Sequence, residues 1–173
     1  MNFKPIAAAG LVIIFTFAAL ALGCKAAGRG ADGSSPLQGA LEPENENEAR
    51  LNRLQPPDRV MDAIGVKPGH VVAEIGAGRG RYAVQLAARV GATGKVYAED
   101  IDADALDHLR SRCDRWDIRN IETVLGEVND PRLPPDSLDL IFIISSFHHF
   151  DDPVTLLGNA RNALKRSGRL AIV

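Results

Sequence analysis

A carboxylate followed by three closely spaced glycines is the part of this chain best suited to bind a ligand. The carboxylate is Glu74, and the glycines come at alternate positions after it: Gly76, Gly78 and Gly80. Because glycine has no Cβ, the backbone can turn sharply there and a ligand can approach it closely. The apolar run 71–75 predicts a buried strand before the turn, and apolar residues at helical spacing over 81–90 predict a helix after it. This order is typical of a nucleotide site at the carboxyl end of the first strand of an α/β fold.

The spacing of the glycines discriminates between two kinds of nucleotide ligand. A dinucleotide-binding turn has the pattern G-x-G-x-x-G, which would require a glycine at the position of Arg81. The third glycine is instead Gly80, so the spacing disfavours an NAD-dependent oxidoreductase. For the glycines taken alone, the alternative is a tight strand-to-helix turn that binds no ligand.

The composition indicates one globular domain. Hydrophobic residues make up 46% of the 173 residues, which is enough for one well-buried domain. The formal net charge of −2 gives no indication of a nucleic-acid surface, so we expect no nucleic-acid partner. The two cysteines do not suggest a disulfide framework. Cys113 falls in a predicted helix, where a small core residue is the simplest interpretation.

The first 24 residues are predicted to be a signal peptide or a membrane anchor. Residues 6–22 are almost wholly apolar, and their length suits the apolar region of a signal peptide better than a membrane span. Residues 21–24 resemble a bacterial lipoprotein processing site with Cys24 as the lipidated residue, and an uncleaved anchor is the alternative. Either interpretation predicts a membrane-associated protein, and the charges that flank the segment leave the side of the membrane open.

Residues 25–48 are predicted to form a flexible linker, and residues 49–173 the globular domain. The linker has almost no large apolar side chains, so it cannot bury enough surface to order itself. In the domain, predicted strands and helices alternate, which implies a parallel sheet with right-handed crossovers. The predicted strands are 71–75, 95–98, 120–125, 138–144 and 169–173.

Polar residues lie at the ends of the first four predicted strands. They are Glu74, the pair Glu99 and Asp100, Glu127, and the pair His148 and His149. Open parallel sheets bind ligands at the carboxyl ends of their strands, so these residues are expected to border one site.

The motifs together resemble the class I S-adenosylmethionine-dependent methyltransferase domain, from about residue 50 to the end of the chain. The resemblance is carried by residues 62–69, 74–80, 94–101, 148–150, 164–165 and 168–170. It implies a doubly wound, Rossmann-like α/β fold with a parallel sheet of strand order 3-2-1-4-5. The family usually has two further strands, so we expect the sheet to be truncated at the fifth strand and the domain to be incomplete at its C-terminus.

The resemblance implies S-adenosyl-L-methionine as the cofactor. Glu74 would orient the methionine ammonium, since a carboxylate favours a nearby cation. Asp100 would accept hydrogen bonds from both ribose hydroxyls; Glu99 is the alternative, but strand alternation points it the other way. Glu127 would meet the adenine amine. Within the glycine turn, Arg79 departs from the family, which often has a small residue there. The expected cofactor-binding residues are Glu74, Gly76, Ala77, Gly78, Gly80, Asp100, Ile101 and Glu127.

The implied reaction is an in-line displacement at an already activated methyl group, so the protein chiefly supplies alignment and a shielded pocket. A base is needed only where the acceptor must lose a proton. His148 and His149 are the candidate catalytic residues, and the alternative is that one of them hydrogen-bonds the backbone and shapes its loop. No metal site is expected, because adjacent histidines lack a third ligand at useful spacing.

The leading hypothesis is methyl transfer to a small-molecule or lipid-like acceptor, by a protein held at a membrane through its N-terminal segment or a lipidated Cys24. Two alternatives are a non-catalytic module that binds the nucleoside cofactor and an NAD-dependent oxidoreductase. A lipoprotein leader predicts export, whereas the cofactor is expected in the cytoplasm, and the sequence leaves this opposition open.

Overall fold

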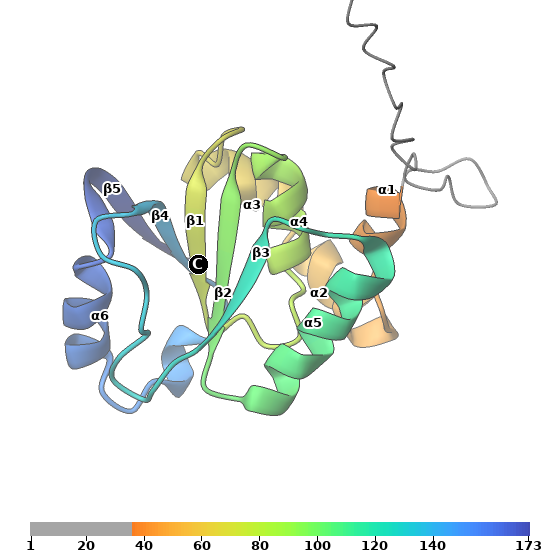
Figure 1. Cartoon of the computed structure of the whole chain (residues 1–173). Helices are drawn as coiled ribbons and strands as arrows, with labels where there is room; N and C mark the ends of the chain where they lie inside the picture. Colours follow the sequence, from red (N-terminus) through yellow and green to blue (C-terminus); the bar gives the residue numbers. More distant parts are fainter. Residues whose placement is uncertain (1–35) are drawn as a thin grey trace, which may run out of the picture.

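Five parallel strands form the centre of the computed structural model, which describes residues 36–173 (Figure 1). The strands are β1 (Val71–Ile75), β2 (Lys95–Asp100), β3 (Ile121–Leu125), β4 (Leu138–Ile143) and β5 (Leu164–Ile172). Their order across the sheet is β3-β2-β1-β4-β5, and every neighbouring pair is parallel. The predicted α/β class, the doubly wound arrangement and the strand order are therefore confirmed.

Helices cover both faces of the sheet and bury two apolar layers. Helices α4 (Ala83–Val90) and α5 (Ala103–Trp116) lie on one face, and α6 (Pro153–Arg161) lies on the other (Figure 1). Alternation along β1 supplies both layers, because Val72 packs in the cluster of α4 and α5, whereas Ala73 and Ile75 pack in the cluster of α6. This double cover explains why β1 and β4 are apolar on both faces apart from Glu74 and Asp139.

Local signals in the sequence fix where the helices begin. Asp102 accepts hydrogen bonds from the backbone N–H groups of Asp104 (2.9 Å) and Ala105 (3.2 Å), and so caps α5. A proline stands in the first turn of both α3 (Pro57–Ile64) and α6, where its missing N–H would have no helical partner. A short 3₁₀ turn, η1 (Phe147–His149), precedes α6.

One side chain fastens three strands together at the amino-terminal edge of the sheet. Asp139 of β4 accepts hydrogen bonds from the backbone N–H of Val71 in β1 (2.9 Å) and from the ammonium of Lys165 in β5 (2.8 Å). Partial burial raises the pKa of the Asp139 carboxyl, but the bonds from Lys165 and Val71 outweigh burial and hold it below its usual value. The fastening lies at the edge opposite to the predicted site.

The predicted flexible linker is wrong for residues 36–48, which form α1 (Pro36–Leu41) and the start of α2 (Glu46–Leu54). The anchor is Arg112 of α5, which is only 1% exposed. Its guanidinium donates to the carbonyl oxygen of Ala40 at 2.9 Å and to Glu48 Oε1 at 3.1 Å. A buried guanidinium with such partners can order a segment that has little apolar surface of its own.

The predicted signal peptide or anchor over residues 1–24, with Cys24, and the linker residues 25–35 lie outside the described residues. Across residues 36–173, no helix is both long enough and apolar enough to cross a bilayer. Cys113 packs against the core as a free thiol, and burial raises its pKa to about 11.

Replacing Arg112 by alanine should leave Glu48 without its cation and release α1 and α2. We expect the free energy of unfolding to fall by about 3 kcal/mol, as when one partner of a buried ion pair is removed. Arg115→Ala is the control, because Arg115 is mostly exposed and pairs with Glu44 at 3.3 Å; it should cost less than about 1 kcal/mol. Urea denaturation followed by circular dichroism measures both, and equal losses would contradict the role given to Arg112.

Candidate functional site

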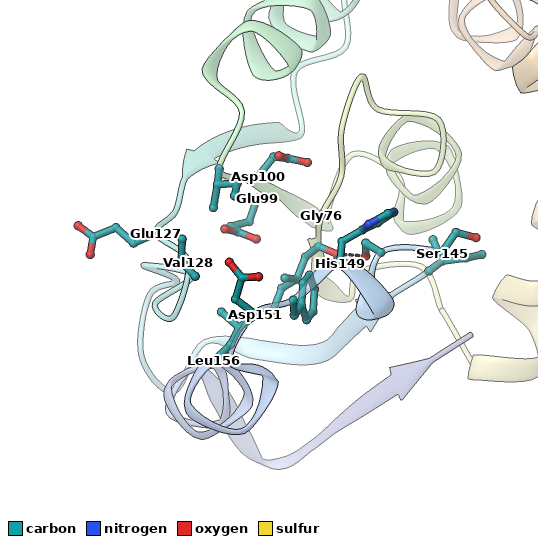
Figure 2. Close-up of a pocket in the computed structure, with 14 residues that line it drawn as sticks. Gly76, Glu99, Asp100, Glu127, Val128, Ser145, His149, Asp151 and Leu156 are labelled. Carbon is teal, nitrogen blue, oxygen red and sulfur yellow. Dashed lines mark hydrogen bonds between the residues drawn. The ribbon is translucent and has the colours of Figure 1, made fainter.

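A cavity of about 350 Å³ opens at the carboxyl ends of β1, β2 and β4 (Figure 2). Its walls come from the glycine turn after β1, the end of β2, the segment after β3 and the segment between β4 and α6. Five of the predicted site residues line it: Gly76, Asp100, Ile101, Glu127 and His149. The predicted residues that are not part of its lining are Glu74, Ala77, Gly78, Gly80 and His148.

The glycine turn is tied to the end of β2 by hydrogen bonds. The N–H groups of Gly76 and Ala77 donate to the carbonyl oxygen of Glu99 at 2.9 and 2.8 Å. The N–H of Gly78 donates to Asp100 Oδ2 at 2.6 Å. The three glycines of the turn have φ between +53° and +88°, a region that side-chain-bearing residues rarely adopt.

The glycines are required for different reasons. A Cβ at Gly76 would lie 2.6 Å from Ser146, and a Cβ at Gly80 would overlap Leu109 of α5, so packing leaves no room for a side chain at either position. A Cβ at Gly78 would meet no atom within 4 Å. The space beside Gly78 is therefore open to a ligand.

Asp100 is held in a fixed orientation by two backbone N–H groups. Oδ2 accepts from Gly78 at 2.6 Å, and Oδ1 accepts from Asp102 at 2.9 Å. Each carboxylate oxygen keeps a further lone pair, and the side chain lines the cavity. Asp100 can therefore accept two more hydrogen bonds in a set geometry, as two neighbouring ribose hydroxyls would require.

Glu74 is a buried carboxylate that lacks a hydrogen-bond partner at one oxygen. It is 3% exposed, and no residue of 36–173 donates to its Oε2. Burial raises the pKa of Glu74 to about 8, the positive charge of Arg81 opposes this rise, and the negative charge of Asp100 adds to it. A buried carboxylate without a partner is unfavourable until a cation or donor reaches it. Its free oxygen therefore fits the ammonium group of the cofactor that the sequence implies.

A second buried carboxylate, Glu99, also lines the cavity, although the sequence favours Asp100 (Figure 2). Glu99 is 2% exposed, and its carboxylate occupies the space that a side chain at position 126 would need. Burial raises the pKa of Glu99 to about 8, with the charge of Asp100 adding to the effect and the N–H of Gly76 opposing it. Alternation puts the two acids on opposite faces of β2, but the cavity spans the end of the strand and reaches both.

Glu127 borders the cavity, but its carboxylate forms an ion pair with Arg132. Figure 2 shows this carboxylate pointing away from Glu99 and Asp100. The predicted contact with an adenine amine would require the pair with Arg132 to open.

Two exposed apolar side chains add to the cavity wall. Ile101 follows β2 and is 59% exposed, and Val128 follows Glu127 and is 49% exposed. Apolar side chains of this size are exposed at cost, and a planar ligand that covered them would remove apolar area from water.

Of the two predicted catalytic histidines, only His149 lines the cavity. The rings of His148 and His149 lie 3.9 Å apart in η1, and both residues are exposed. Within residues 36–173, the backbone N–H of His149 donates to the carbonyl oxygen of Ser146 at 2.9 Å and so helps to form the 3₁₀ turn. In the same part of the chain, no group of three or more His, Cys, Asp or Glu side chains is arranged to hold a metal ion.

Ser145 and Ser146 line the cavity without having been assigned a role from the sequence. Ser146 Oγ donates to the carbonyl oxygen of Ile75 at 3.1 Å, and Ser145 Oγ donates to Gln55 Oε1 at 3.1 Å. Ser145 has a φ of +56°, which is a strained conformation for a non-glycine residue. Their position directly after an apolar strand, at the edge where Glu74 lies, is the signal that could have found them.

Proteins with related sequences share this region of the chain. A family model described as a methyltransferase domain matches residues 72–168. Aklanonic acid methyltransferase of Streptomyces sp. (strain C5) is 29% identical over 113 residues, which are 65% of this chain and 51% of that protein. A ubiquinone/menaquinone biosynthesis C-methyltransferase of Cellvibrio japonicus is 32% identical over 114 residues, which are 65% of this chain and 46% of that protein. The chain therefore spans about half the length of these curated relatives.

Solved structures share the fold. A SAM-dependent methyltransferase from Aquifex aeolicus aligns with a TM-score of 0.67 and 28% sequence identity. The alignment covers 80% of this chain and 70% of that one.

The raised pKa of Glu74 predicts how the stability of the ligand-free protein depends on pH. The folded protein retains this proton up to about pH 8, whereas the unfolded chain releases it near 4.5, so stability should fall as the pH rises between these values. Glu74→Gln removes this contribution. By calorimetry, the variant should melt about 4 °C or more above the wild type at pH 8, and much closer to it at pH 5. A variant that is less stable than the wild type at pH 8 would contradict the burial of an ionisable group here.

A side chain at Gly78 should block the ligand without unfolding the domain. We expect Gly78→Leu to weaken binding of S-adenosylhomocysteine by more than about tenfold, because the new side chain enters the open space of the turn. Gly91→Leu is the matched control, since Gly91 also has a positive φ (+69°) and no atom within 4 Å of a Cβ, but lies before β2 at the opposite edge of the sheet. Titration calorimetry measures binding and thermal melting measures stability. Equal binding by the two variants would place the ligand elsewhere.

Proposed function

The chain belongs to the methyltransferase domain family, whose cofactor is S-adenosyl-L-methionine, and we propose that it transfers the methyl group of this cofactor to a small-molecule acceptor. The family match favours this over the NAD-dependent alternative. Because the chain spans about half the length of the curated relatives, the activity and acceptor of the whole protein belong to the proposal.

The observation that carries the proposal is the unpartnered carboxylate of Glu74 at the end of β1. It sits two residues before the glycine turn, and the turn leads to Asp100 through the hydrogen bond from Gly78. The backbone turn thus connects Glu74, which can bind a cation, to Asp100, which can accept hydrogen bonds from hydroxyl groups. Methionine ammonium and ribose hydroxyls, as parts of one molecule, suit this order of groups.

When bound, the cofactor supplies a sulfonium-activated methyl group, so the chain's own residues chiefly bind, orient and exclude water. Glu74 would hold the ammonium group and Asp100 the ribose. Ile101 and Val128 would gain cover from a planar base, which removes their exposed apolar area from water. The backbone of Gly76, Ala77, Gly78 and Gly80 would follow the methionine and ribose portions of the cofactor.

His149 is the candidate general base, because its imidazole lines the same cavity. It would accept a proton only from an acceptor that must lose one. His148 lies outside the lining, so we propose no direct role for it.

We propose a small organic acceptor, with lipid-like molecules included. Two observations support this class: the relatives are named for aklanonic acid and for quinone biosynthesis, and apolar side chains border the cavity. Association with a membrane through residues 1–24 or a lipidated Cys24 is also a proposal, which the apolar sequence of residues 6–22 supports.

Binding of S-adenosylhomocysteine to the full chain at pH 7 should release a proton, because a nearby ammonium lowers the raised pKa of Glu74. Calorimetric titration in buffers of different ionisation enthalpy measures this release. Glu74→Gln should abolish the release and weaken binding by roughly tenfold or more. Asp104→Asn, which removes a charge from the exposed first turn of α5, should change neither.

Radiolabelled S-adenosyl-L-methionine and a panel of quinone, polyketide and lipid acceptors test the transfer step. Transfer to a member of the panel is the expected result. Tight binding without transfer to any of them would contradict the catalytic proposal and favour the non-catalytic binding module. Failure of the wild type to bind S-adenosylhomocysteine would contradict the site itself.

A further inference from the structure

Arg79, the residue between the second and third glycines of the turn, directs its side chain away from the cavity to α5. Its Nη2 lies 2.8 Å from Nδ1 of His108. On the other side of the same imidazole, Nε2 lies 2.6 Å from Oε2 of Glu44, in the connection between α1 and α2. The series Arg79–His108–Glu44 therefore joins the glycine turn to the N-terminal helices through one ring.

The chemistry of these groups fixes the direction of both hydrogen bonds. A guanidinium can only donate, so Nδ1 of His108 must accept from Arg79. The proton of the neutral ring then lies on Nε2, which donates to the carboxylate of Glu44. Only one tautomer of the neutral imidazole makes both contacts, with Arg79 on one side of the ring and Glu44 on the other.

Glu44, the last residue of this series, is held by contacts with several basic side chains. Partial burial raises the pKa of Glu44, but the hydrogen bond from His108 and the charges of Arg112 and Arg115 outweigh burial and hold it below its usual value. Arg112 lies 3.8 Å from Glu44 Oε2 and also bonds Glu48 of α2. The position of Glu44 is thus tied to that of both N-terminal helices.

Part of the surface of α2 is separated from the glycine turn by a small cavity. A cavity of about 170 Å³ lies between them, with Glu48 and Leu51 of α2 on one side and Ala77 and Arg79 of the turn on the other. Side-chain bridges border this gap. One is Arg79–His108–Glu44, and another is Arg81, which donates to Asn52 (3.2 Å) and Gln55 (3.1 Å) of the N-terminal segment.

We propose that His108 is a positioning residue of the cofactor site, which couples docking of residues 44–55 to the conformation of the glycine turn. Directly before Arg79 in the turn, the N–H of Gly78 donates to Asp100, the acid proposed to bind the ribose. Fixing Arg79 therefore helps to fix one of the two N–H groups that orient Asp100. By thermodynamic reciprocity, a cofactor that stabilises the turn also stabilises docking of the N-terminal segment. This inference rests on the proposed cofactor site.

A double-mutant cycle on the full chain tests the coupling, with the affinity for S-adenosylhomocysteine as the readout. Arg79→Ala and Glu44→Ala should each weaken binding by about fivefold, because each removes one hydrogen bond to His108. The double variant should also lose about fivefold rather than 25-fold, because either change breaks the same series. In a His108→Ala background, neither change should have a further effect.

Two control variants separate positioning from loss of structure. Glu44→Gln keeps an acceptor for Nε2–H of His108 and should retain most of the affinity. Arg115→Ala removes another partner of Glu44 that does not touch the turn, and should leave the affinity unchanged.

Hydrogen exchange gives a readout that does not depend on activity. S-adenosylhomocysteine should slow amide exchange over residues 44–55 in the wild type, and less so in His108→Ala. Additive losses in the cycle, or unchanged affinity in Arg79→Ala and His108→Ala, would overturn the coupling while leaving the proposed function intact. A wild type that binds no S-adenosylhomocysteine would overturn the proposed function and this inference with it.

Discussion

The binding edge of this domain depends on a buried carboxyl group whose Oε2 has no hydrogen-bond partner among residues 36–173. Glu74 is the last residue but one of the central strand β1, which β2 and β4 flank and apolar layers cover on both faces. Glu99, a second buried acid, lies on the neighbouring strand, and the pKa of each is raised to about 8. Two such acids make the ligand-free edge less favourable than an apolar one would be. The fold tolerates this because apolar clusters cover both faces of the sheet, and a cationic ligand would lower the cost of ionising these acids.

The glycine turn, which follows β1, is the second feature on which the binding edge depends. A chain that leaves a buried strand must turn at once if its backbone is to present N–H groups beside the acids. Packing excludes side chains at Gly76 and Gly80, and the backbone conformation disfavours one at Gly78. The turn is therefore defined by contacts with Ser146 and Leu109, which come from distant segments of the chain. The strand β1, the glycine turn and the helix α5 that packs against the turn therefore form one packed unit.

The sequence predicts those features whose causes are local. The mostly apolar strands β1 and β4, the glycine turn, and Asp100 at the end of β2 each follow from neighbouring residues. Features with distant causes could not be predicted. Residues 36–48 are ordered by Arg112, which lies 64 residues after Glu48 and looks like any other arginine on a charged helix. The outward direction of Glu127 goes with its ion pair to Arg132, five residues later, which neither helix nor strand periodicity indicates. Glu99 lines the cavity because the cavity is wide enough to reach both faces of β2, and strand alternation alone does not predict that width.

The fastening of three strands by Asp139 has a consequence for how such a domain can diverge. Val71, Asp139 and Lys165 set the relative positions of β1, β4 and β5 at the rim farthest from the chemistry. The loops of the opposite rim are therefore not needed to hold these strands together. Mutations in those loops can change which molecule is bound while the sheet still folds in the same way. Separating assembly from recognition in this manner lets one architecture explore many acceptors over evolutionary time.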